Sequence, residues 1–107
     1  MNVDMLEAEI PLEPCDPASV VSGSPAEGYV AIGAIGDREL GVWEITPGTV
    51  TAVESAEAFV VLRGEATVSF VDDRPSLDLR PGVAADLADG ERTVWTVHET
   101  LRKAVVS

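Results

Sequence analysis

Residues 57–64 read EAFVVLRG and residues 79–90 read LRPGVAADLADG, and these two stretches give the clearest indication of the fold. In the first stretch Glu57, Phe59 and Val61 alternate with their neighbours, which is the period of a strand with one buried face. The second stretch carries the turn sequences Arg80-Pro81-Gly82 and Asp89-Gly90, which favour tight reversals between antiparallel strands. Short strands joined by tight turns predict an all-β protein.

The same pattern extends outward from these stretches over residues 29–107. Short runs rich in Val, Ile, Thr, Trp and Phe are separated by Gly, Pro and Asp, with Arg63-Gly64 as one of the predicted turns, and no helix is expected. Strands this short need closure or a second layer, which predicts a jelly-roll barrel. The nine predicted strands are Tyr29–Ala34, Leu40–Thr46, Gly48–Glu54, Ala58–Leu62, Glu65–Phe70, Ser76–Leu79, Val83–Leu87, Arg92–Val97 and Leu101–Val106.

Residues 1–28 differ from the rest, and we expect them to form an extended acidic arm. Prolines and glycines in this stretch exclude a long helix, and it holds no basic residue. Its apolar residues predict that part of the arm lies across the barrel or a neighbouring subunit, with one short strand within Glu7–Leu12. The expected organisation is an arm over residues 1–28 and one barrel domain over residues 29–107.

Length, charge and cysteine content narrow the class of protein. A chain of 107 residues is one domain. The formal net charge of −12 disfavours nucleic acid as a partner, because it repels phosphate. One cysteine, Cys15, permits no internal disulfide and suits a reducing compartment. No apolar stretch is long enough to span a bilayer and no export signal is visible, so we expect a cytoplasmic protein without a membrane partner.

Four blocks of sequence resemble a single-domain cupin with an RmlC-like jelly roll, of the branch related to ureidoglycine aminohydrolase cupin domains. The resemblance implies a double-stranded β-helix, and it covers about two-thirds of the chain. The blocks are residues 41–48 (GVWEITPG), 57–64 (EAFVVLRG), 79–82 (LRPG) and 95–103 (WTVHETLRK).

Metal-dependent cupins place three histidines in two motifs that this sequence only partly matches. Glu57 and Gly64 occupy the positions of the glutamate and the closing glycine in the first motif. Thr51 and Val53 occupy the positions of its paired histidines. With a longer gap those positions fall on Val50 and Ala52 instead. The third histidine of the pattern falls on Thr93, and Val97 replaces asparagine. The resemblance therefore implies no tightly bound metal, and no cofactor is expected; the alternative is a divalent ion held by Glu54, Glu57 and His98.

Period-two alternation selects the side chains that are expected to face the barrel interior. Glu57 is the tentative catalytic residue, because burial would make it a general base or an anchor for a polar ligand. The alternative is a solvated Glu57 at the barrel mouth, or one paired with Arg63 or Arg92. The predicted ligand pocket comprises Trp43, Thr51, Val53, Glu57, Phe59, Val61, Thr93, Trp95 and Val97.

Three further polar residues lie in the last block. By alternation from Trp95 and Val97, His98 faces away from the interior, which favours a structural role over a proton shuttle. Arg102 and Lys103 alternate faces, so one of them could reach the barrel rim and pair with a carboxylate. The favoured interpretation is that they are exposed or edge-protecting charges.

Three functions fit these observations. The leading hypothesis is a metal-free barrel that binds a small organic molecule. The first alternative is a metal-dependent or Glu57-assisted enzyme acting on a small ureido, amino-acid or sugar-like metabolite. The second alternative is a structural homodimer whose barrel is filled by its own side chains.

Overall fold

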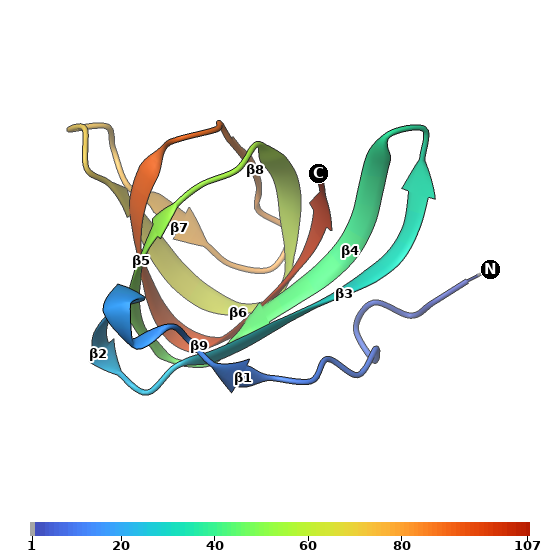
Figure 1. Cartoon of the computed structure of the whole chain (residues 1–107), viewed down its shortest axis with the longest axis horizontal. Coiled ribbons are helices and arrows are strands. Elements are labelled where there is room, and N and C mark those ends of the chain that lie inside the picture. Colours follow the sequence, from blue (N-terminus) through green and yellow to red (C-terminus); the bar gives the residue numbers. More distant parts are fainter. Residues whose placement is uncertain (1) are drawn as a thin grey trace.

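The computed structural model describes residues 2–107 and forms one curled, nine-stranded antiparallel sheet (Figure 1). The predicted all-β barrel is confirmed. The elements are β1 (Glu13–Pro14), the short 3-10 helix η1 (Pro17–Ser19), β2 (Val20–Gly23), β3 (Ala26–Ile35), β4 (Arg38–Ile45), β5 (Gly48–Val53), β6 (Glu57–Phe70), β7 (Leu77–Leu79), β8 (Ala84–Leu87) and β9 (Arg92–Val106).

Strand β9 holds the barrel together because it pairs with three other strands. Its first half, from Arg92 to Val97, lies between β5 and the second half of β6, and its second half pairs with β4 and the first half of β6. In Figure 1 this strand, coloured orange to red, curves along the lower side of the barrel. Side chains on its inner face therefore come from both halves of one continuous strand.

The segments predicted as four separate strands form two long, bent ones. Residues 58–62 and 65–70 belong to β6, and residues 92–97 and 101–106 belong to β9. Arg63-Gly64 is not a hairpin turn, because the pairing of β6 with β9 continues past it through successive register shifts. Such bulges bend a strand without ending it.

Gly64 makes the bend possible. Its φ of +88° favours glycine, and a Cβ at this position would lie 2.1 Å from the carbonyl oxygen of Thr100. The two long strands therefore touch backbone to backbone at this point.

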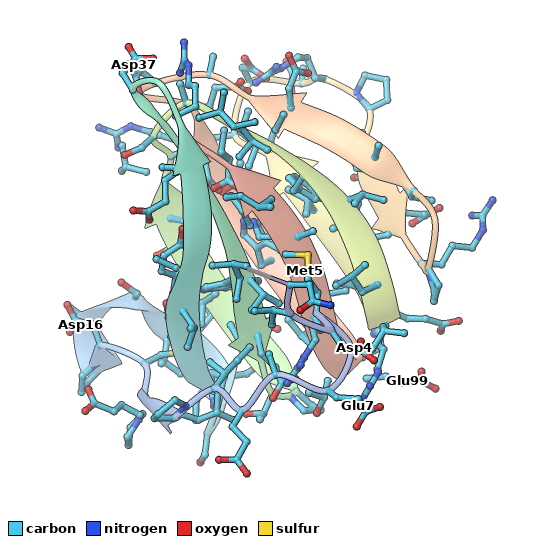
Figure 2. All side chains as sticks on the ribbon, turned by 90° about the vertical axis from the view of Figure 1, so that its right-hand side faces the viewer. Asp4, Met5, Glu7, Asp16, Asp37 and Glu99 are labelled. Atoms are coloured by element: carbon cyan, nitrogen blue, oxygen red, sulfur yellow. The ribbon has the colours of Figure 1, made fainter. Side chains whose placement is uncertain are left out.

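The N-terminal residues are held against the sheet. No strand forms within Glu7–Leu12; instead β1 pairs with β3 and β2 pairs with β5. The buried guanidinium of Arg102 donates to the backbone carbonyls of Met5, Leu6 and Ala8 at 3.0, 3.1 and 2.8 Å. Figure 2 shows Met5 lying over the ribbon, with Asp4 and Glu7 beside it.

The hydrophobic core fills the barrel interior. Ile45, Leu101, Val61 and Val68 are among the side chains with almost no exposed surface, and Trp95 and Phe59 pack against them. None of the helical structure in residues 2–107 has the length and hydrophobicity of a transmembrane segment.

Candidate functional site

A cavity of about 230 Å³ opens between the barrel and the N-terminal residues. Its walls come from strands β3, β4, β5, β6 and β9 and from the segment around η1. The lining residues are Asp16, Ser19, Glu27, Trp43, Val50, Thr51, Ala52, Glu54, Glu57, Trp95, Lys103 and Val105.

An ion pair lies at the cavity wall. Lys103 Nζ donates a hydrogen bond of 2.8 Å to Glu57 Oε2, and the Lys103 side chain is only 5% exposed. Lys103 is the only lysine in the sequence. The single side-chain amine of the protein is therefore buried in its cavity.

Three aromatic rings surround this amine. Lys103 Nζ lies 4.6 Å from the ring centroid of Trp43, 4.4 Å from that of Phe59 and 4.7 Å from that of Trp95. The rings of Trp43 and Trp95 meet edge to face, with centroids 5.7 Å apart. Ring faces attract a cation, so the three rings favour a positive charge at this point.

Burial and charge act in opposite directions on the amine. Burial lowers the pKa of Lys103 below its ordinary value, because desolvation disfavours the charged form. The carboxylates of Glu57, Glu54 and Glu27 oppose this lowering. Desolvation is the larger effect, so Lys103 gives up its proton more readily than an exposed lysine does.

A second carboxylate is fixed by hydrogen bonds. Glu54 Oε2 accepts from Thr93 Oγ1 at 2.6 Å and from the indole Nε1 of Trp95 at 2.9 Å. Thr93 and Trp95 are both almost fully buried. These bonds orient Glu54 towards the cavity and satisfy the Trp95 N–H, which a buried indole requires.

The cavity carries an excess of negative charge. Four carboxylates line it, from Asp16, Glu27, Glu54 and Glu57, against the single ammonium of Lys103. Because Lys103 neutralises one carboxylate, the other three make the potential of the cavity negative. Such a lining attracts cations, repels anions and does not exclude neutral molecules.

The predicted pocket residues fall into four groups. Four of them line the cavity, namely Trp43, Thr51, Glu57 and Trp95. Phe59 and Thr93 contact lining residues without lining the cavity themselves, whereas Val61 and Val97 are buried in the core. Val53 is 68% exposed and faces away.

The expected inward orientation does not hold for Val53, whereas Thr51 is exposed but still lines the cavity. Val50 is buried, Ala52 is half-buried, and both line the cavity, while Thr51 and Val53 are exposed. A shift of one residue turns every side chain of a strand to the opposite face. The alternative alignment, in which Val50 and Ala52 occupy the histidine positions, is the one that points inward.

These residues do not fit a metal. Two ligand positions hold hydrocarbon side chains, and Thr93 donates its hydroxyl to Glu54. His98 does not join Glu54 and Glu57, because it is exposed and lies 3.2 Å from Thr67 Oγ1 outside the cavity. Across residues 2–107, no three His, Cys, Asp or Glu side chains are grouped to hold an ion.

Lys103 is the main residue that the favoured sequence interpretation missed. Arg102 and Lys103 are both buried rather than exposed, and Lys103 pairs with Glu57 in place of Arg63 or Arg92. The sequence did contain a signal for the burial of Lys103. This residue lies an even number of residues from Trp95, Val97 and Leu101, which face inward, so alternation along the strand places it on the same face. Arg102 faces outward from the barrel and is buried by the N-terminal residues.

The fold is shared with solved structures. A protein of unknown function from Pseudomonas syringae is similar with a TM-score of 0.80 and 23% identity, over 97% of this chain and 46% of that one. The EutQ protein of Clostridium difficile is similar with a TM-score of 0.71 and 12% identity, over 98% of this chain and 83% of that one. A protein of unknown function from Rhizobium leguminosarum is similar with a TM-score of 0.66 and 24% identity, over 75% of this chain and 78% of that one.

At these identities the likenesses show the fold alone. This chain spans about half of the Pseudomonas syringae protein. The comparison with curated proteins gave no match. The ureidoglycine aminohydrolase branch stays a prediction. The sequence profile of the EutQ-like cupin domain matches residues 32–104, which is more than half of the chain. The protein therefore belongs to the EutQ-like cupin domain family.

Proposed function

We propose that this cupin domain binds a small organic molecule, neutral or positively charged, in the cavity at Lys103 and Glu57. The observation that carries the proposal is the composition of the cavity wall. It combines two indole rings with a buried ion pair and further carboxylates. Apolar walls with a few fixed polar groups are typical of ligand sites.

The size of the cavity limits the ligand. A volume of about 230 Å³ lies below the roughly 300 Å³ at which pockets for drug-sized molecules begin. It suits a metabolite with a short carbon skeleton. Open space beside Lys103 also favours a ligand-binding barrel over one filled by its own side chains.

Charge gives the proposal its sharpest test. Butylammonium, butanamide and butyrate have similar size but carry a positive, zero and negative charge. The protein has two tryptophans, Trp43 and Trp95, and both line the cavity. Intrinsic fluorescence and the melting temperature therefore report on the site. We expect butylammonium and butanamide to change both readouts, and butyrate to leave them unchanged.

A matched pair of variants localises the effect. Glu27→Gln removes a carboxylate from the cavity lining, whereas Glu99→Gln removes an exposed carboxylate outside the cavity. Butylammonium should bind Glu27→Gln about two- to fivefold more weakly, as expected for a partly screened charge, and Glu99→Gln unchanged. The proposal fails if no compound alters the fluorescence, or if butyrate binds as tightly as butylammonium.

A further inference from the structure

The surroundings of Lys103 support a covalent role for its amine. A nucleophilic lysine needs an apolar pocket, a group that takes its proton, and free space for the electrophile. Three aromatic rings form the apolar surroundings, Glu57 Oε2 lies 2.8 Å from Nζ, and both residues line the open cavity.

We propose that Lys103 forms an imine with a small neutral aldehyde or ketone bound in the cavity. The inference rests on the proposed function and names a substrate class for the same site. An anionic oxoacid is disfavoured, because the carboxylates of Asp16, Glu27 and Glu54 line the same space.

The proton balance can be written with the residues present. Glu57 takes a proton from the Lys103 ammonium, and the free Nζ attacks the carbonyl carbon, forming a C–N bond as the C=O π bond breaks. One proton passes from nitrogen to the new alkoxide, which gives a neutral carbinolamine. Glu57 then returns its proton to the hydroxyl, which leaves as water. The product is an iminium ion paired with the Glu57 carboxylate.

The aromatic rings suit this product. An iminium ion is a cation, as the original ammonium is, so the rings of Trp43, Phe59 and Trp95 and the carboxylate of Glu57 still face a positive charge. The lowered pKa of Lys103 agrees with a readily available free amine.

Reductive trapping provides the test, because the chain contains one lysine. Protein at pH 7 is incubated with propanal and sodium cyanoborohydride, which reduces an iminium to a stable secondary amine. Peptide mass mapping then finds Lys103 heavier by the mass of propanal less one oxygen atom. The terminal α-amine provides an internal reference for ordinary reactivity.

We expect Lys103 to be modified at least tenfold faster in the folded protein than in urea, and at least tenfold faster with propanal than with the anionic aldehyde glyoxylate. Glu57→Gln should slow the folded-state reaction at least tenfold, whereas the exposed-site control Glu99→Gln should not. Lys103→Arg, checked for folding by circular dichroism, should leave only the α-amine modified. If Lys103 is modified no faster in the folded protein than in urea, imine formation is overturned. If butylammonium still binds in that case, the proposed ligand binding stands without imine formation.

Discussion

Lys103 Nζ and Glu57 Oε2 form a 2.8 Å ion pair between β9 and β6, and its two side chains are 5% and 17% exposed. Glu57 is therefore partly buried and also paired, and its partner is Lys103 rather than Arg63 or Arg92. The pairing also explains how a charge is retained beside apolar rings, because each partner compensates the other. The proposed ligand binding and part of the barrel's stability both depend on this contact.

Removing only one partner of the pair should destabilise the fold. Lys103→Met leaves Glu57 as an unpaired charge near the core, and losing one partner of a buried pair costs about 3–5 kcal/mol. The residual exposure of Glu57 places the expected loss at the low end of that range. The double variant Lys103→Met/Glu57→Leu should recover most of it. Urea unfolding measures both values, and a double variant no more stable than the single one would contradict this account.

The Arg102 guanidinium should hold the N-terminal residues in place. It donates at 2.9 Å to Glu44 Oε1 and also to three backbone carbonyls. In Arg102→Met, the amides of Leu6, Glu7 and Ala8 should exchange hydrogen at least about tenfold faster, which corresponds to a loss of about 1.4 kcal/mol. Arg63→Met is the control, because exposed Arg63 contacts Leu6 and Glu7 from solvent. Equal exchange in both variants would show that Arg102 has no special role.

Gly64 should tolerate alanine much less well than Gly82 does. Both have similar φ values, +88° and +92°, but only Gly64 meets backbone atoms where a Cβ would lie. Gly82→Ala should cost about 1–2 kcal/mol for the left-handed backbone. Gly64→Ala should cost a further 1–3 kcal/mol, roughly, for the clash with Thr100. Thermal unfolding compares the two, and equal losses would exclude the close contact between β6 and β9.

The thiol of Cys15 should titrate far above its ordinary range. Burial raises its pKa to about 12, and the hydrogen bond and charge of Glu27 add to the increase. The folded state therefore keeps a proton that the unfolded chain releases near pH 9. The stability from this group is complete below that pH and is lost as the pH rises towards 12. Thiolate absorbance measures the titration, and Glu27→Gln should lower the midpoint; a wild-type midpoint near 9 would refute the prediction.

Alternation was sufficient to predict much of the barrel interior. Phe59, Trp95 and Thr93 are buried as the period of two requires. It failed at Val53, which is exposed, because the register of β5 depends on its pairing with β9 rather than on its own sequence. The Arg63-Gly64 sequence separately predicted a turn, where Gly64 only bends β6.

The cavity could be predicted only in part, because its walls join residues far apart in the chain. Asp16 and Glu27 come from the N-terminal quarter, and no local pattern places them beside Lys103. The hydrogen bonds of Arg102 to the N-terminal backbone likewise join opposite ends of the sequence.

The homodimer expected from the apolar residues of the arm stays a prediction, which light scattering would test. Ile10 of that arm is buried against its own chain.

Nuclear magnetic resonance of the two indole N–H groups shows whether a ligand occupies the cavity, because Trp43 and Trp95 both line it. On titration of ¹⁵N-labelled protein with butylammonium, we predict that both indole signals shift together and saturate with one dissociation constant. The same titration with butyrate should leave them in place. Indole signals that stay fixed while butylammonium binds would place the ligand elsewhere and contradict the account.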